Sequence, residues 1–169
     1  MLDFFTVSFF GHRRLEQIFT VEQRLETIID NLLREKEYVE FLVGRDGEFD
    51  LLAASVVKRC KRRMDTNNCA LVWVLPYPTA EFRASEESFR EYYDEIEICD
   101  VSSQAHYKGA FQARNREMVD RSSLVICCVE RQSGGAYQAM RYALKNTIPV
   151  INLSELEEEC ERELVRRFL

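Results

Sequence analysis

Short apolar runs alternate along this chain with longer segments of mixed polarity. The first run, FFTVSFF, begins at Phe4 and stops at Gly11. It is rich in aromatic and β-branched residues and too short for a helix that buries itself, so it predicts a buried strand. Similar runs predict strands at residues 38–43, 69–75, 95–99, 124–129 and 148–153. This alternation predicts an α/β fold of three layers, Rossmann-like, with a mainly parallel sheet and helices on both faces.

Apolar residues at helical spacing fill most of the intervals between these runs. Thr20 and Gln23 predict a capping box that opens the first helix, and a second helix is expected from about Phe49. Further helices are expected at residues 86–93 and 110–122, after Gly135 and after Ser154, with a loop at 100–109. The stretch 79–94 is either a flap over a site or a long connection. No repeat or linker is visible, which predicts a single domain over residues 1–169.

Glycines follow three of the predicted strands. The turns contain Gly11-His12-Arg13, the loop from Gly44 through Gly47 to Asp50, and Ser133-Gly134-Gly135. A strand, a glycine loop and a helix in succession present unpaired N–H groups and the positive end of a helix dipole to an anion. Neither the GxGxxG fingerprint nor a Walker loop is present. Because the carboxyl ends of parallel strands share one edge, the turns should meet there around a small phosphorylated ligand.

One predicted helix carries polar residues on its apolar face. By three-and-four spacing, Arg114 and Asn115 share the face of Phe111. A buried arginine is costly unless it is paired. Arg114 therefore either meets an internal carboxylate such as Asp50 or Asp120, or awaits an anionic ligand, and the sequence leaves both open.

Composition narrows the classes of function. The 169 residues are 46% hydrophobic and 31% charged, with a net charge of −6, which is typical of a globular protein and argues against a dedicated duplex-DNA binder. No apolar run approaches the roughly 20 residues of a membrane span, and the N-terminus does not resemble a signal peptide, so a cytoplasmic location is expected. The six cysteines form no CxxC pair and lie mostly in apolar runs. They predict buried thiols rather than a metal site, and no cofactor is expected.

At these turns and the helix between them, the sequence resembles the SLOG superfamily of Rossmann-like proteins, which includes DprA-like and LOG-like members, and most closely its YpsA-like branch. The matching segments are Phe9-Phe10-Gly11-His12-Arg13, Gly44-x-x-Gly47-x-x-Asp50-x-x-Ala53, Arg114-Asn115-x-x-Met118-Val119-Asp120-x-Ser122, Ser133-Gly134-Gly135, Tyr142-Ala143 and Val150-Ile151-Asn152-Leu153. The resemblance implies a pocket for a nucleotide or nucleotide derivative above the strand ends. Its expected ligand-binding residues are Gly11, His12, Arg13, Gly44, Gly47, Asp50, Arg114, Asn115, Ser133, Gly134 and Gly135.

The enzymatic members of that superfamily hydrolyse the N-glycosidic bond of nucleoside monophosphates with a PGGxGTxxE motif and an upstream arginine. This chain departs from the motif. When Gly134-Gly135 is aligned with the glycine pair, the later glycine, threonine and glutamate are replaced by Tyr137, Gln138 and Arg141. Glycoside cleavage needs a positioned carboxylate. Candidates to substitute are Glu48, Asp50, Glu117 and Glu130, so whether the protein is an enzyme is left open.

Three functions follow in order of preference. The first is a sensor or binding module for a nucleotide-derived small molecule, without chemistry of its own. The second is a phosphoribohydrolase in which Arg114 holds the phosphate. The third is single-stranded nucleic-acid binding through the basic run 58–63, which is less favoured because cations at a helix end also suit the negative end of its dipole. A homodimer is expected, because related folds often pair through surface helices.

Overall fold

A computed structural model describes residues 3–103 and 106–155 of the chain. Six parallel strands form one sheet in the order β4-β3-β2-β1-β5-β6. They are β1 (Phe4–Gly11), β2 (Tyr38–Val43), β3 (Cys69–Leu75), β4 (Glu95–Ile98), β5 (Leu124–Cys128) and β6 (Val150–Asn152). All carboxyl ends of these strands therefore point to the same edge, and the predicted parallel sheet is confirmed.

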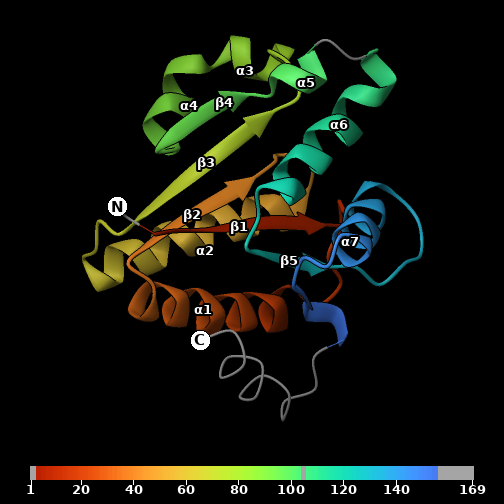
Figure 1. Cartoon of the computed structure of the whole chain (residues 1–169). Helices are drawn as coiled ribbons and strands as arrows, with labels where there is room; N and C mark the ends of the chain where they lie inside the picture. Colours follow the sequence, from red (N-terminus) through yellow and green to blue (C-terminus); the bar gives the residue numbers. More distant parts are fainter. Residues whose placement is uncertain (1–2, 104–105, 156–169) are drawn as a thin grey trace.

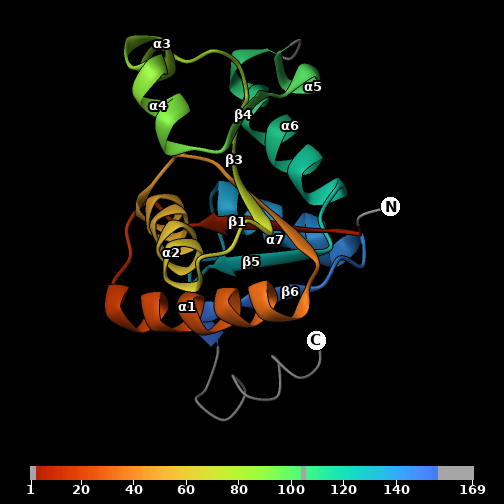
Figure 2. The ribbon, with the colours of Figure 1, turned by 90° about the vertical axis from the view of Figure 1, so that its left-hand side faces the viewer.

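Helices cover both faces of the sheet (Figures 1 and 2). On one face, α1 (Ile18–Glu35) and α2 (Glu48–Met64) pack with Phe9 and Phe41 of the central strands into one buried cluster. On the other face, α6 (Tyr107–Asp120) and α7 (Gly135–Lys145) pack against a second cluster that includes Leu42 and Val72. The expected three-layer arrangement is thus confirmed, because each sheet face buries its apolar side chains against a helix pair.

The segment between β3 and β4 packs on the sheet rather than over the strand ends. It contains the short helices α3 (Ala80–Ala84) and α4 (Glu86–Tyr92). Phe82, Phe89 and Tyr93 surround the buried ring of Trp73, with ring centroids 6.0, 4.9 and 5.3 Å away. This aromatic packing identifies the segment as a connection that completes the core, not as a flap.

Several element boundaries differ from those expected. α1 begins at Ile18, and the carbonyl of Gln17 accepts the N–H of Val21 at 3.1 Å, so Thr20 lies inside the helix and the capping box at Thr20 is wrong. The expected loop at 100–109 contains the helix α5 (Asp100–Ser103) and the start of α6. After β6 comes a single 3₁₀ turn, η1 (Leu153–Glu155). The final helix expected after Ser154 falls mostly on residues outside the described part of the chain.

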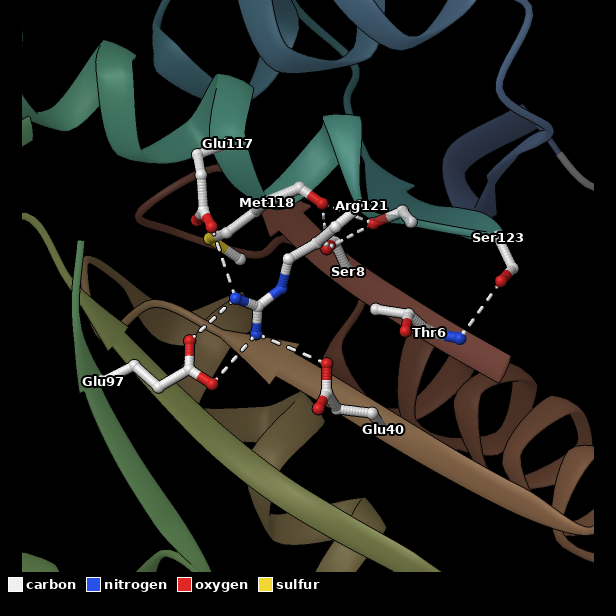
Figure 3. Close-up of polar contacts among 9 residues, drawn as sticks. Thr6, Ser8, Glu40, Glu97, Glu117, Met118, Arg121 and Ser123 are labelled. Atoms are coloured by element: carbon white, nitrogen blue, oxygen red, sulfur yellow. Dashed lines mark hydrogen bonds and ion pairs between the residues drawn. The ribbon is translucent and has the colours of Figure 1, made fainter. Parts of the chain in front are cut away.

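Polar contacts hold the carboxyl-terminal end of α6 on the sheet (Figure 3). Arg121 donates to both carboxylate oxygens of Glu97 on β4, at 2.8 and 3.1 Å, and to Glu40 on β2 at 3.3 Å. The hydroxyl oxygens of Ser8 on β1 and Ser122 lie 2.7 Å apart. With this end fixed, the residues about two turns earlier in α6 lie near the carboxyl ends of the strands.

The cysteines of the described residues lie in the core, as expected. Cys60, Cys69, Cys99, Cys127 and Cys128 are all buried, whereas Cys160 lies outside the described residues. Burial raises the pKa of the Cys60 thiol to about 12, the opposite of what a thiolate nucleophile needs. Within residues 3–103 and 106–155 no cluster of His, Cys, Asp or Glu is suited to a metal ion, and no helix has the length and apolar character to cross a bilayer.

Candidate functional site

A cavity of about 490 Å³ lies where the strand order reverses. β1 stands between β2 and β5, so the loops that follow these three strands meet at its carboxyl end. The cavity is lined by Phe9, Phe10, Gly11, His12, Arg13, Gly44, Asp46, Asp50, Phe111, Arg114, Asn115, Arg131, Ser133, Gly134, Gly135 and Ala136. Its volume is in the range of small-molecule pockets.

The structure brings together the residues that the sequence selected. Every expected ligand-binding residue except Gly47 lines this cavity, and α6 contributes Arg114 and Asn115 from above the sheet. Gly47 instead precedes the first residue of α2 and packs against the backbone of Arg13. The part of these residues in binding a ligand stays a prediction.

Two of the glycines are required by packing within the protein. A Cβ on Gly11 would lie 2.2 Å from Cγ of Phe49, and one on Gly47 would lie 2.4 Å from Cα of Arg13. The space on the Cβ side of Gly11 is therefore filled by Phe49, although Gly11 also lines the cavity. Gly134 differs, because its φ of 90° favours glycine while a Cβ there would meet no atom within 4 Å.

The amino-terminal end of α7 borders the cavity, and no side chain in the described part of the chain compensates the positive end of its helix dipole. The carbonyl of Gly134 accepts the N–H of Gln138 at 3.1 Å, which leaves the N–H groups of the first turn without intrahelical partners. No acidic residue stands in this turn, and no side chain caps it. In contrast, α2 carries Glu48 and Asp50 in its first turn. Of these two helices, α7 therefore presents the more favourable end to an anion.

Two arginines that line this cavity have no side-chain partner of their own among the described residues. Arg13 follows β1 and Arg131 precedes the glycine pair, and both line the cavity. Among the described residues, neither guanidinium makes a hydrogen bond or an ion pair. Their charges therefore add to the helix dipole and favour a bound phosphate or carboxylate.

Arg114 is paired inside the protein. Its side chain is 3% exposed; Nη2 donates to Oδ2 of Asp46 at 2.5 Å and Nη1 to the carbonyl of Val74 at 3.1 Å. Nε and Nη2 also donate to Oδ1 of Asn115, at 3.1 and 2.9 Å. The inward orientation is as predicted, but the partner is Asp46 rather than Asp50 or Asp120. Arg114 is thus a buried arginine that forms an ion pair with the partly exposed Asp46 at the wall of the cavity.

Asp50 is a buried carboxyl group at the same end of the cavity. Its Oδ2 accepts the backbone N–H of Asp46 at 2.9 Å. Burial, and then the neighbouring Asp46 carboxylate, raise the pKa of Asp50 from 3.8 to about 7, although that hydrogen bond and the charge of Arg114 oppose the shift. Asp50 therefore holds a proton over much of the range below neutral pH.

His12 links two of the loops. Its Nε2 accepts the backbone N–H groups of Glu130 and Arg131, each at 3.1 Å. Burial, and then the positive charge of Arg131, lower the pKa of His12, and Glu130 acts in the opposite direction. The imidazole is therefore mainly neutral at pH 7 and joins the end of β1 to the loop before α7.

The basic run at residues 58–63 lies in the carboxyl-terminal half of α2, about 12–20 Å along the helix from the cavity-lining Asp50. Arg59 and Arg63 pair with carboxylates of α1, and Lys61 pairs with Asp94 at 3.1 Å. These partners neutralise most of the run. It is therefore largely engaged within the protein and offers little free charge to nucleic acid.

Of the candidate substitute carboxylates, only Asp50 lines the cavity. Glu48 accepts the N–H of Leu15 at 2.7 Å, and Glu117 contacts Arg121 at 3.3 Å. The structure adds Asp46 and Arg131, which sequence reasoning did not single out. Both residues could have been found from their position in the sequence, because they lie in the glycine loops that were expected to meet.

Comparison with known proteins gives a fold but no family. No protein-family model and no curated protein matches the chain. DNA processing protein A (DprA) from Streptococcus pneumoniae superposes with a TM-score of 0.62 at 15% identity, over 97% of this chain and 56% of that protein. This chain therefore spans little more than half of that protein's length.

Two further structures agree. DprA from Helicobacter pylori, whose structure concerns a single-stranded DNA binding mode, gives a TM-score of 0.56 at 19% identity, over 97% of this chain and 73% of that one. The molybdenum cofactor carrier protein MCP from Chlamydomonas reinhardtii gives 0.57 at 13% identity, over 98% and 85%. The chain has a DprA-like Rossmann fold. At these identities the likeness concerns the fold alone.

Proposed function

We propose that this chain is a single-domain binding module of the YpsA-like type for a nucleotide or nucleotide-derived small molecule, with no chemistry of its own. The ligand's phosphate would lie at the amino-terminal end of α7, against Gly134, Gly135 and Ser133. The rest of the ligand would extend between Phe10 and Phe111 toward the polar side chains of Asp46 and Asp50. Assembly as a homodimer belongs to the same proposal.

The observation that carries this proposal is a cavity that contains both the uncapped end of α7 and two unpaired arginines. A helix end without an acidic first turn, in the same cavity as Arg13 and Arg131, favours a bound anion. In a chain of net charge −6, such a concentration of positive potential inside a cavity favours an anionic small molecule.

A thermal-shift panel of nucleotides, cyclic nucleotides and ADP-ribose derivatives tests the proposal, followed by calorimetry with each compound that stabilises the protein. We expect the double variant Arg13→Ala/Arg131→Ala to bind each stabilising compound about tenfold more weakly or worse, and to show a smaller thermal shift with it. Its melting temperature without ligand should stay unchanged. The exposed Arg90, which pairs with Glu86 and lies over the ring of Phe82, away from the cavity, gives the control Arg90→Ala. No stabilisation by any phosphorylated compound would overturn the proposal.

A second candidate is hydrolysis of the N-glycosidic bond of a nucleoside monophosphate. The specific observation in its favour is Asp50, a cavity-lining carboxyl with a pKa of about 7, suited to protonate a leaving base while water attacks the sugar carbon. Incubation with nucleoside monophosphates followed by chromatography for free base distinguishes it from simple binding. Base release that disappears in Asp50→Asn would make the protein an enzyme; binding without release supports the first proposal.

Binding of single-stranded nucleic acid is a further alternative, through a surface other than the basic run at residues 58–63. A groove on the outer side of α6 and α7 is lined by Arg116, Tyr137, Gln138, Arg141, Tyr142, Leu144 and Lys145, with no carboxylate among them. Cations interleaved with aromatic rings suit bases and phosphates. Oligonucleotides in the same panel test this, because Arg116→Ala/Arg141→Ala should weaken their binding and leave mononucleotide binding unchanged.

A further inference from the structure

One ring nitrogen of His12 accepts two backbone hydrogen bonds. Its Nε2 lies 3.1 Å from the backbone nitrogens of both Glu130 and Arg131. Two N–H donors can share Nε2 only if that nitrogen carries no hydrogen. The single proton of the neutral ring must therefore be on Nδ1, and the two backbone amides select this tautomer.

The contact has consequences for the loop before α7. Gly11 is paired with Cys128 in the β1–β5 register, so His12 is the first residue beyond the strands that can hold the chain leaving β5. The loop that it holds leads directly to Ser133 and Gly134, at the uncapped end of α7. His12 also lines the cavity, where the remaining donor it can offer is Nδ1–H.

We propose that His12 is a positioning residue of the anion site: its neutral, Nδ1-protonated imidazole anchors the β5–α7 loop through Nε2, and a second proton releases that loop. This rests on the proposed function only for its effect on ligand binding. Once Nε2 carries a proton, it can no longer accept hydrogen bonds, and its N–H faces the two backbone N–H donors. Both hydrogen bonds would then be lost. Anion binding should then weaken in acid, whereas a histidine that simply attracts an anion would bind it more tightly in acid.

The charged groups around His12 set the conditions for this behaviour. They are Arg13 on its own loop, Glu130 and Arg131 on the β5–α7 loop, and Asp46, Asp50 and Arg114 across the cavity. Burial and Arg131 lower the pKa of His12, so the anchored form dominates at neutral pH and release occurs on the acid side of the usual histidine range. Asp50, whose pKa is raised to about 7, also takes up a proton in this range, and comparison with a variant that lacks the His12 imidazole distinguishes the two events.

Nuclear magnetic resonance of the ligand-free protein tests the anchor directly. At about pH 7.5 we expect a protonated Nδ1 and an unprotonated Nε2 in His12, distinguished from His106 by comparison with His12→Gln. We also expect the exchange protection of the Glu130 and Arg131 amides to fall about fivefold or more as His12 titrates. A protonated Nε2 at neutral pH, or amide protection that ignores the titration, would overturn the proposal.

Two variants separate positioning from charge. Glutamine in His12→Gln offers an acceptor oxygen near the place of Nε2 and does not titrate, so amide protection should persist at every pH. His12→Leu removes the acceptor and should lose protection throughout, and if it fails to fold the comparison of wild type with His12→Gln still decides. Equal pH dependence of protection in wild type and His12→Gln would show that another group is responsible.

Sulfate supplies the binding measurement, because its charge is constant between about pH 5 and 8. Titration with sodium sulfate, against sodium chloride at equal ionic strength, should shift the amides of Gly134 and Gly135. Protonation of Asp50 in this pH range affects wild type and His12→Gln alike, so the comparison between them isolates His12. We expect the affinity of wild type to fall about fivefold relative to that of His12→Gln from pH 7.5 to 5.5. The same pH dependence of affinity in both proteins would overturn the proposal. Failure of sulfate to bind at any pH would instead count against the proposed function, while the amide measurements would still decide the role of His12.

Discussion

Replacing Asp50 by asparagine should make the protein more stable at neutral and alkaline pH. Asp50 is 7% exposed and lies beside the Asp46 carboxylate, and its pKa is raised from 3.8 to about 7. The folded state therefore binds a proton that the unfolded state releases, so unfolding free energy falls as pH rises from about 4 to 7 and is level above that. A rise of the pKa from 3.8 to about 7 corresponds to at most about 4 kcal/mol.

Asparagine is a close match for the protonated side chain. Its Oδ1 can still accept the N–H of Asp46, which Asp50 accepts at 2.9 Å, and it carries no charge. Urea denaturation of wild type and Asp50→Asn at intervals from pH 4 to 8 measures the effect. The difference between their unfolding free energies should be near zero at pH 4 and grow in favour of the variant up to about pH 7. A difference that does not change with pH would refute the raised pKa and with it the role of Asp50 as a proton donor.

The other predictions concern packing and the anchor of α6. Gly11→Ala should destabilise the fold by about 2 kcal/mol or more, because its Cβ would lie 2.2 Å from Phe49. Gly134→Ala should cost about 1–3 kcal/mol for a different reason: its φ of 90° and ψ of 176° lie in a backbone region that essentially only glycine adopts, although a Cβ there would meet no atom within 4 Å. Urea denaturation measures both. Arg121→Met should destabilise the protein by about 1 kcal/mol, because the arginine is 31% exposed and its ion pairs with three glutamates are partly screened by solvent. The loss should be larger at pH 8, where the glutamates are charged, than at pH 4. The surface variant Arg90→Met is its control and should be close to neutral.

Local pattern was enough to predict the strands and the site loops. The run from Cys69 to Leu75 is buried at every position, and its apolar character in the sequence predicted this strand with its observed bounds. The glycine turns after β1, β2 and β5 were expected to meet because parallel strands end at one edge, and they line one cavity. Boundaries that depend on backbone hydrogen bonds were less predictable, as at Thr20, where the helix starts before the expected cap.

The sequence by itself determined the alternation of elements, the parallel sheet, the edge at which the loops meet and the inward face of Arg114, because these depend on side-chain periodicity and chain direction. Only the tertiary structure decided the partners. Asp46 rather than Asp50 pairs with Arg114, and Phe49 fills the space beside Gly11. His12 anchors a loop more than a hundred residues away. Such contacts depend on distances of a few ångströms between segments remote in the chain, and local sequence does not encode them.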